Sequence, residues 1–163
     1  MEPTEISPED HRHLLRSIAL AAEARAGNNH PFGALLVDAA GAVLCEAGNT
    51  VVTARDPTGH AELNLVRLAG PIDPAVLARA TLYTSTEPCA MCAGAIYWSG
   101  IGRVVFALPE DALRAMTGAD PKNPTLELPC REVFARGQRP VVVAGPAAIA
   151  EARAVHAGFW TPA

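Results

Sequence analysis

Apolar residues recur with helical spacing at the start of the chain. Ser7 is followed by a proline and two acids, a combination typical of the first turn of a helix. Apolar positions then repeat every three or four residues, as at Leu14 and Ile18, until Gly27 interrupts them. The pattern predicts an amphipathic helix that begins after Ser7 and ends at Gly27.

Further along, short apolar runs with strand character alternate with helical ones. The expected strands cover residues 32–37, 43–46, 81–84, 103–107 and 140–144, and the expected helices or helical turns cover 60–69, 73–80, 89–99, 111–116, 130–136 and 147–156. Between them, residues 48–59 and 117–129 are expected to be loops. The first two strands should form an antiparallel hairpin, and right-handed helical crossovers should join the later strands. The expected fold class is therefore α/β with a mixed sheet.

Size and composition favour a single domain over residues 1–163. The chain weighs 17.0 kDa, half of its residues are hydrophobic and 18% are charged, which excludes a disordered chain and a coiled coil. Only 5% of the residues are aromatic. Close packing of helices on the sheet should therefore depend on small residues.

The charge balance argues against a nucleic-acid partner. The formal net charge is −4 and Lys122 is the only lysine, whereas binding to phosphates needs clustered basic side chains. Residues 1–5 lack the features of a signal peptide, and no apolar run approaches the roughly 18 residues of a membrane helix. We therefore expect a cytoplasmic protein without a membrane partner, whose cysteines serve metal or redox chemistry rather than disulfides.

Two short motifs carry candidate chemistry, His60-Ala61-Glu62 and Pro88-Cys89-Ala90-Met91-Cys92. Each opens a predicted helix, and cysteines three residues apart share one helical face. Helix N-termini also favour the thiolate, which is the form that binds metals. With His60 as a third ligand, a tetrahedral zinc ion would keep one open position, as catalytic zinc sites do.

Glu62 is the candidate proton carrier of this site. In a regular helix, positions i and i+2 point about 200° apart, so His60 and Glu62 face one site only if His60 lies at the helix cap. Gly59, directly before it, permits such a bend. Zinc lowers the pKa of a bound water, and a nearby carboxylate could take up its proton and pass it to a leaving nitrogen.

Each motif alone is ambiguous. A lone CxxC is equally typical of a redox pair, and an isolated HxE carries little information. Together they match the HxE…PCxxC signature of zinc deaminases, which favours catalytic zinc. Outside the motifs, Cys45 is expected to be a buried small residue, and no role is assigned to Cys130.

The neighbourhood of both motifs resembles bacterial guanine deaminases of the cytidine-deaminase-like superfamily. The likeness covers residues 49–67, including Asp56-Pro57-Thr58-Gly59-His60-Ala61-Glu62, and residues 82–98, including Glu87-Pro88-Cys89-Ala90-Met91-Cys92. It implies a three-layer α/β/α fold with a five-stranded mixed sheet, zinc on the histidine and the two cysteines, and Glu62 as proton shuttle. It also implies that Asn49 hydrogen-bonds the base and that Phe32 lies against its ring.

The full set of expected substrate contacts comprises Phe32, Asn49, Ala61, Glu87, Trp98 and Asp111. Two stretches, residues 92–95 and 101–106, look equally like tRNA adenosine deaminases of the superfamily. After Ala107 the chain matches neither group well. Guanine deaminases have an acidic residue and a closing C-terminal tail in that region, for which Asp111 and Phe159-Trp160 are the candidates.

The leading hypothesis is hydrolytic deamination of a small free nucleobase, with guanine to xanthine as first choice. Cytosine, isocytosine, an aminated triazine or another aminopurine stay open, because a single pocket group decides among them. The alternatives are a tRNA adenosine deaminase and, in another class, a redox or structural CxxC module. A homodimer or larger assembly is expected, because the resemblance implies assembly through the helices that carry the zinc ligands. Ile96 and the scarce aromatic residues Tyr97 and Trp98 lie at the end of one such predicted helix.

Overall fold

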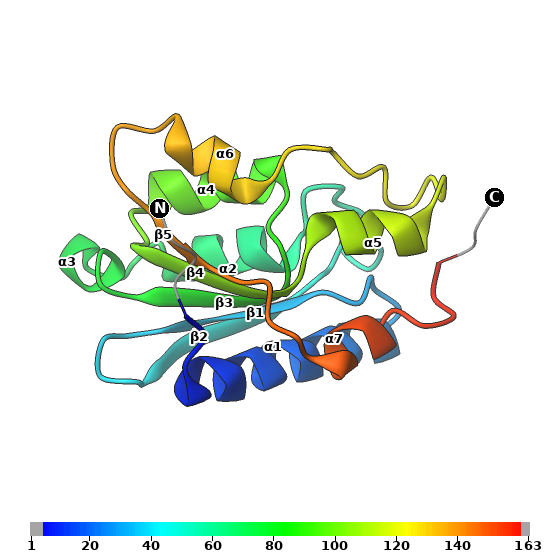
Figure 1. The fold of residues 1–163 in the computed structure, drawn as a ribbon, viewed down its shortest axis with the longest axis horizontal. Helices are drawn as coiled ribbons and strands as arrows, with labels where there is room; N and C mark the ends of the chain where they lie inside the picture. The colour runs from blue at the N-terminus through cyan, green and yellow to red at the C-terminus, as the bar shows by residue number, and fades with distance from the viewer. Residues whose placement is uncertain (1–4, 161–163) are drawn as a thin grey trace.

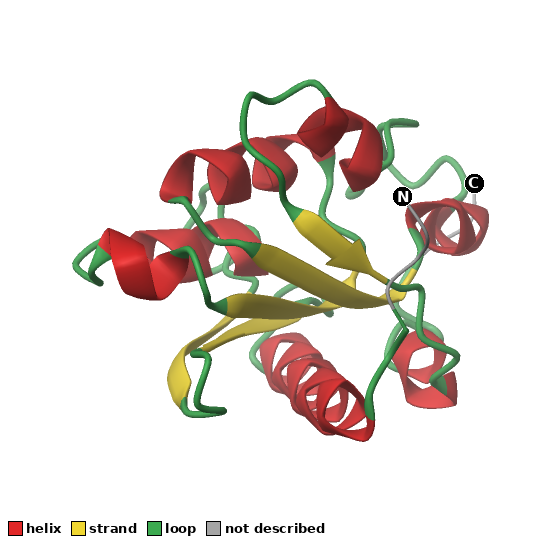
Figure 2. Cartoon of the chain, turned by 60° about the vertical axis from the view of Figure 1, so that its left-hand side comes forward, coloured by secondary structure: helices red, strands yellow, loops and turns green. Residues whose placement is uncertain are grey.

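Helices cover both faces of a central five-stranded sheet in the computed structural model, which describes residues 5–160 (Figure 1, Figure 2). The strands are β1 (Gly33–Val37), β2 (Val43–Gly48), β3 (Thr81–Thr86), β4 (Arg103–Leu108) and β5 (Val142–Ala144). The helices are α1 (Pro8–Ala26), α2 (Ala61–Ala69), α3 (Pro74–Leu77), α4 (Ala90–Ser99), α5 (Glu110–Thr117), α6 (Cys130–Ala135) and α7 (Ala150–Ala154). In Figure 1, α1 and α7 lie below the sheet, and α2, α4 and α6 lie above it. The expected three-layer α/β fold is confirmed.

The strands follow the order β2-β1-β3-β4-β5 across the sheet. β1 pairs antiparallel with both β2 and β3, whereas β3, β4 and β5 run parallel to one another. The hairpin expected at the start of the sheet is therefore confirmed. Because β1 has a neighbour on each side and helices on both faces, all five of its residues are buried.

The carboxyl ends of β3 and β4 meet at one edge of the sheet. There the backbone N–H of Glu87 donates to the carbonyl of Leu108 at 2.8 Å. The chain leaves β3 into α4 and leaves β4 into α5. The first turns of α4 and α5 therefore begin side by side, at the position where ligand sites of parallel sheets are usually built.

Helix α1 begins with a capping box. The Ser7 hydroxyl accepts a hydrogen bond from the backbone N–H of Asp10, whose carboxylate accepts one from the backbone N–H of Ser7. That carboxylate also accepts two bonds from the Arg103 guanidinium, at 2.6 and 3.0 Å, and one from the Tyr83 hydroxyl at 2.8 Å. Burial alone would raise the pKa of Asp10, but the bonds from Arg103, Ser7 and Tyr83 lower it well below its usual range. The start of α1 is thus anchored to β3 and β4.

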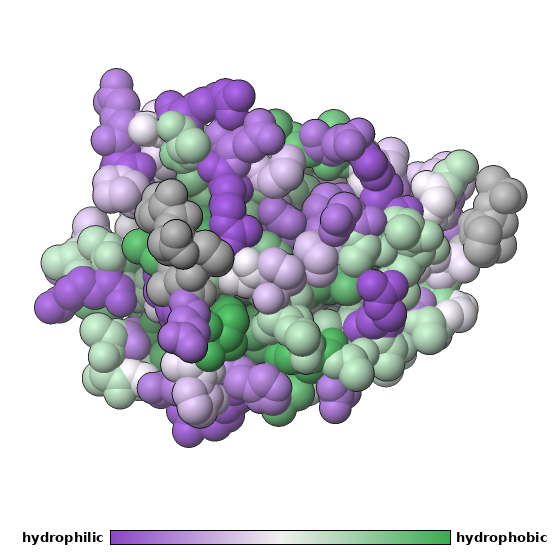
Figure 3. Space-filling view, in the orientation of Figure 1, coloured by the Kyte–Doolittle hydropathy of each residue, from purple (hydrophilic) through white to green (hydrophobic). Residues whose placement is uncertain are grey.

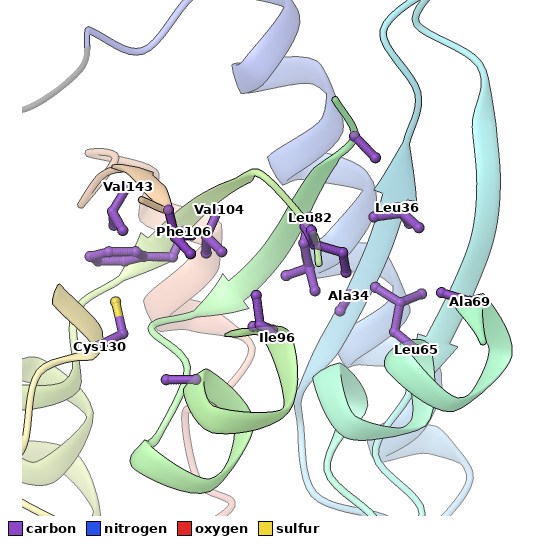
Figure 4. Close-up of a cluster of buried hydrophobic side chains, with 14 of the residues drawn as sticks. Ala34, Leu36, Leu65, Ala69, Leu82, Ile96, Val104, Phe106, Cys130 and Val143 are labelled. Carbon is purple, nitrogen blue, oxygen red and sulfur yellow. The ribbon is translucent and has the colours of Figure 1, made fainter. Parts of the chain in front are cut away.

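Two apolar clusters fill the spaces between the sheet and its helix layers. On the α2 and α4 side, Leu36, Leu82 and Val104 of the sheet pack with Leu65 and Ile96 of the helices (Figure 4). The second cluster lies between α1 and the opposite face of the sheet. Because successive strand residues point to opposite faces, a sheet covered on both sides needs continuous apolar runs, as these strands have.

The last helix is shorter than the sequence predicts. Helical spacing suggested residues 147–156, whereas α7 covers only Ala150–Ala154. The backbone N–H of Ala147 is engaged by the carbonyls of Phe106 and Ala107, each at 3.2 Å. This pairing holds the segment extended along β4, so the helix begins only after Ile149.

The molecular surface is a mosaic of hydrophilic and hydrophobic residues on the face shown in Figure 3. Within residues 5–160, the most exposed large hydrophobic residues are Trp98, at 85%, Leu126, at 57%, and Leu68, at 56%. Among the described residues, no helix has the length and apolar character that a membrane span requires.

Candidate active site and metal centre

His60, Cys89 and Cys92 come together as one potential metal centre, called here the ligand cluster. The Nδ1 atom of His60 lies 3.6 Å from the Sγ atom of each cysteine, and all three atoms lie within 4.8 Å of one another. In a tetrahedral zinc site with Zn–S near 2.3 Å and Zn–N near 2.0–2.1 Å, sulfur and nitrogen lie about 3.6 Å apart. The spacing of the cluster therefore fits zinc with one position left for another ligand.

Helix caps place these ligands. His60 is the N-cap of α2, with φ −69° and ψ 150°, and Cys89 is the N-cap of α4, with φ −64° and ψ 170°. Cys92 lies in the first turn of α4, and α2 and α4 pack against each other. The extended backbone at His60 places this residue outside the helix proper. His60 and Glu62 can therefore face the same site, as their spacing required. The positive ends of the two helices converge on the cluster and favour thiolate ligands.

Gly59 is needed for a close approach of two chain segments. A side chain at this position would bring its Cβ to 2.8 Å from the Thr50 hydroxyl oxygen and 3.2 Å from the Val51 nitrogen. The backbone N–H of Thr50 donates to the Gly59 carbonyl at 2.8 Å. From the sequence, Gly59 was expected to let the backbone bend. In the structure, the absence of a side chain at Gly59 instead lets the 49–59 loop pack closely beside the N-cap of α2.

The two cysteines differ in acidity. A hydrogen bond with Cys92 lowers the pKa of Cys89 to about 4, against the opposing effect of burial, and His60 contributes a second bond. The same bond with Cys89 raises the pKa of Cys92. Cys89 is therefore the thiol of the pair that loses its proton more easily, and the thiolate is the form that binds a metal ion.

Glu62 lies beside the ligand cluster in a buried position. Its carboxylate accepts a 2.8 Å hydrogen bond from the Thr84 hydroxyl of β3. Burial raises the pKa of Glu62, and the negative charge of Cys89 acts in the same direction. A raised pKa makes it easier for the carboxylate to take up a proton, which a general acid–base catalyst must accept and return.

A cavity of about 400 Å³ opens in front of the cluster. It is lined by His30, Phe32, Val51, Pro57, His60, Glu62, Thr86, Glu87, Cys89, Met91, Glu110, Leu113, Pro121, Lys122, Asn123, Pro124, Thr125 and Leu126. Its volume is in the range of small-molecule sites. The cavity brings the histidine and one cysteine of the cluster together with Glu62.

Glu110, rather than Asp111, is the acidic residue that α5 presents to the cavity. Glu110 is the first residue of α5 and is 9% exposed, whereas Asp111 is exposed and lies outside the cavity lining. Each helical residue turns by about 100°, so neighbours face different ways, while Glu110 and Leu113 share one face. Burial, together with the charges of Cys89 and Glu87, raises the pKa of Glu110 to about 8. The spacing of Glu110 and Leu113 indicates a shared helical face, but it does not tell that this face borders the cavity.

The other expected substrate contacts occupy different places. Phe32 and Glu87 line the cavity, whereas Asn49 and Ala61 are buried outside its lining. The side-chain oxygen of Asn49 accepts bonds from the backbone N–H groups of His30 and Val51, at 3.3 and 3.0 Å. Asn49 thus positions the chain on both sides of the cavity.

Trp98 lies away from the cavity. It projects from the far end of α4 with 85% of its surface exposed, and its ring meets that of Tyr97 edge-on. The N-terminal end of α4 carries Cys89 and Cys92, and its last turn carries Trp98. The structure therefore does not bring Trp98 together with the other candidate residues.

Glu87 fixes the helices that border the cavity. One carboxylate oxygen accepts the backbone N–H of Glu110 at 3.1 Å, and the other accepts that of Cys130 at 3.0 Å. These groups lie at the first turns of α5 and α6, where N–H groups lack partners within the helix. The sequence suggested no role for Cys130. In the structure, its backbone N–H holds the start of α6 to the Glu87 carboxylate.

The aromatic C-terminal tail packs behind the cavity wall. Within the described chain, Phe159 and Trp160 are not part of the cavity lining. Their rings contact His30, at 5.8 and 5.5 Å between centroids, and Trp160 lies 6.0 Å from Phe32. The tail therefore supports two residues of the wall instead of covering the opening.

Comparison with known proteins gives consistent matches. Residues 7–108 match the family described as the cytidine and deoxycytidylate deaminase zinc-binding region. The chain is similar to a probable cytosine deaminase of Schizosaccharomyces pombe, at 41% identity over 98% of each protein. It is also similar to guanine deaminase of Bacillus subtilis, at 44% identity over 66% of this chain and 69% of that protein.

A solved structure from a study of A-to-I editing by tRNA:A34 deaminases shares the fold. It has a TM-score of 0.67 and 26% identity, over 89% of this chain and 99% of the other. The family match contains Glu62 and all three residues of the ligand cluster.

Proposed function

Because the chain belongs to the family of the cytidine and deoxycytidylate deaminase zinc-binding region, we propose that it deaminates a small free nucleobase, with guanine as first choice. Family membership makes the protein a zinc-dependent deaminase, a hydrolase of carbon–nitrogen bonds. The expected zinc cofactor is confirmed by the family and agrees with the ligand cluster. The redox or structural CxxC alternative is therefore set aside.

Glu62 moves the protons of the proposed reaction. A zinc ion bound by His60, Cys89 and Cys92 would act as a Lewis acid and lower the pKa of a water molecule toward about 7. Glu62 accepts the first proton of the attacking water and gives it to the ring nitrogen, then takes the second proton from the added oxygen and gives it to the leaving amine. The water oxygen becomes bonded to the ring carbon, the bond to the exocyclic nitrogen breaks, and ammonia leaves.

The observation that carries the choice of substrate is the buried carboxyl of Glu110 in the same cavity as Glu62. When ionised, it can only accept hydrogen bonds, so it suits the N–H groups of a base such as guanine. The cavity, at about 400 Å³, and the wall provided by Phe32 suit a flat ring. A nucleoside would also need partners for its ribose hydroxyls.

Cytosine is the second choice among free bases. Support comes from the probable cytosine deaminase of Schizosaccharomyces pombe, which aligns over 98% of this chain. Isocytosine and aminated triazines carry a comparable amine beside ring nitrogens and fit the same chemistry.

Ammonia release from a panel of substrates tests the proposal. The panel contains guanine, cytosine, isocytosine, an aminated triazine, guanosine and a tRNA anticodon stem-loop, all at equal concentration. We expect a free base to give the highest rate and the tRNA to give none. A higher rate with guanosine or the stem-loop would contradict the small-base proposal while leaving the deaminase chemistry intact.

A tRNA adenosine deaminase is the alternative function. The similarity to the structure from the study of tRNA:A34 deaminases favours it. The net charge of −4 and the single lysine oppose it, because polyanion binding depends on basic groups. Salt-dependent retardation of tRNA in a native gel, together with inosine formation, would establish this alternative.

We also propose a homodimer that forms through the exposed ends of α2 and α4. These neighbouring helices carry two of the most exposed large hydrophobic residues, Leu68 and Trp98. Light scattering at micromolar concentration should give twice the mass of one chain. The substitution Trp98→Ser should lower this measured mass. A monomer mass for the wild type would contradict the proposal.

Location in the cytoplasm stays a prediction from the sequence.

A further inference from the structure

Residues 121–126 form one wall of the cavity and are called here the lid segment. All six of them line the cavity, and they belong to the connection between the end of α5 and the start of α6 (Figure 1). The aromatic side chains of the tail, Phe159 and Trp160, lie outside the cavity lining. The lid segment, rather than the described part of the tail, is therefore the candidate cover for a base bound in the cavity.

Within residues 5–160, hydrogen bonds and ion pairs hold the lid segment only near its two ends. At its start, the backbone N–H of Asn123 donates to the carbonyl of Asp120 at 3.1 Å. Just beyond its end, Glu127 pairs with Arg114 of α5 at 2.7 Å. The backbone N–H groups at positions 125–127 have no acceptor in the described part of the chain. Segments with so few hydrogen bonds move at a low cost in free energy.

The Asn123 side chain is a polar group of the cavity wall that lacks a partner. Its Nδ2 atom is shielded from solvent, and neither Nδ2 nor Oδ1 has a hydrogen-bond partner within residues 5–160. A shielded amide without a partner is unfavourable. An amide offers both donors and an acceptor, which are the groups that match the edge of a nucleobase. Because Nδ2 is shielded in this position of the segment, a base reaches it only if the segment moves.

Leu126 gives the lid segment an apolar contact to gain. This residue is 57% exposed although it lines the cavity. Met91, at the start of α4, is a second exposed apolar residue of the same lining. Movement of the segment toward a flat ring in the cavity would remove apolar surface from water, which favours the closed position.

We infer that the lid segment closes over the bound base and that the Asn123 amide forms a hydrogen bond with the base in the closed position. The inference rests on the proposed function and adds a binding residue to it. Closure holds the base in place while Glu62 transfers protons, which is the service that mobile loops provide in many enzymes.

Hydrogen exchange of backbone amides tests the closure. Zinc-loaded Glu62→Gln is saturated with guanine or cytosine, whichever the wild type deaminates, because this variant should bind the base without consuming it. If Glu62→Gln does not bind it, the wild type is saturated with the deaminated product instead. We expect rapid exchange at positions 125–127 without ligand and exchange slower by about tenfold or more with it.

The turn at residues 38–42, which lies outside the cavity lining, is the internal control and should exchange equally in both states. Equal exchange at positions 125–127 with and without a bound ligand would overturn the inference.

Asn123→Ala separates a moving lid from a fixed wall. In the Glu62→Gln background with saturating ligand, loss of the amide should remove most of the protection at positions 125–127. A fixed wall would shield these positions to the same extent with and without the amide. Equal protection in the two proteins would therefore contradict the inference.

The kinetics of Asn123→Ala test the proposed contact in the active enzyme. KM should rise by about tenfold and kcat should change by less than about twofold, because the hydrogen bond would be present in the ground state and the transition state alike. Gln138→Ala is the matched control, since Gln138 is exposed outside the cavity, and it should change neither value. A wild-type KM for Asn123→Ala would remove the contact from the proposal.

The two proposals fail in different ways. Absence of ammonia release from every base with the zinc-loaded wild type would contradict the proposed function. The exchange experiment would then use the base that binds by calorimetry, and absence of binding by guanine and cytosine alike would contradict the lid as well. Turnover by the wild type, with unchanged exchange at positions 125–127, would contradict the lid alone.

Discussion

At the metal end of the cavity, the ligand cluster and Glu62 come from the first turns of two neighbouring helices, α2 and α4. The remaining walls come from segments far apart in the sequence: residues 30–32, the 49–59 loop, the start of α5 and the 121–126 loop. The metal end is thus specified by two short motifs. The substrate walls depend on how the whole sheet brings distant segments together.

The metal end should therefore determine whether the reaction takes place, and the remaining walls should determine which base reacts. Changes at the metal end should abolish the reaction on every substrate, because they remove the metal or the proton carrier. Changes in the walls should alter which base reacts and how tightly it binds. The predictions below test this division.

The largest effect is expected from loss of a metal ligand. Wild-type protein purified without added metal should contain one zinc per chain by elemental analysis, whereas Cys92→Ser should contain almost none and be inactive. Cys130→Ser is the matched control, since Cys130 is equally buried but lies outside the cluster. A wild-type zinc content near zero, with a reversible disulfide between Cys89 and Cys92, would indicate a redox pair instead.

Glu62→Gln should separate proton transfer from metal binding. The amide keeps the shape of the side chain but cannot carry protons, so kcat should fall by at least about 10²–10⁴-fold while zinc content stays at one per chain. Glu46→Gln, on strand β2 and paired with Arg16, serves as the control and should retain wild-type activity. Activity of Glu62→Gln within a few-fold of the wild type would show that another group is the base.

Glu110→Gln should affect binding and its pH dependence. The pKa of Glu110 is raised to about 8, and the carboxylate accepts N–H groups best above that pH. We therefore expect kcat/KM of the wild type to rise as pH approaches about 8. In the variant the rise should flatten and kcat/KM at pH 8 should fall by about tenfold.

Asp111→Asn distinguishes the two neighbouring acids of α5. Asp111 is exposed outside the cavity, so this variant should behave as the wild type. If Asp111→Asn lost activity and Glu110→Gln did not, the assignment of the acidic wall to Glu110 would be wrong.

Apart from the control Asp111→Asn, the smallest effect is expected from removal of the tail after His156. The truncation deletes Phe159 and Trp160, which pack behind His30 and Phe32, and contacts of this kind contribute about 0.5–1.5 kcal/mol each. KM should rise about two- to tenfold with little change in kcat. A chain ending at Trp160 keeps both rings and should match the full-length protein. Unchanged KM in the shorter chain would remove the supporting role of the tail.

The sequence by itself determined the elements that depend on local interactions. The cap of α1 could be read from Ser7 and Asp10, because a capping box joins residues only three positions apart. The same holds for the metal end: His60 and Cys89 are helix caps, and Cys92 follows within one turn. The spacing of the two motifs was therefore enough to predict the ligand cluster and to predict that Glu62 faces the same site.

Only the tertiary structure decided the substrate walls. Glu110 rather than Asp111 faces the cavity because the bond from its backbone N–H to Glu87 sets where α5 begins. His30 and Lys122 are 92 positions apart and share a wall only because β1 lies beside β3 in the sheet and the 118–129 loop returns over the cavity. Such contacts depend on strand order and helix rotation, which spacing along the chain does not encode.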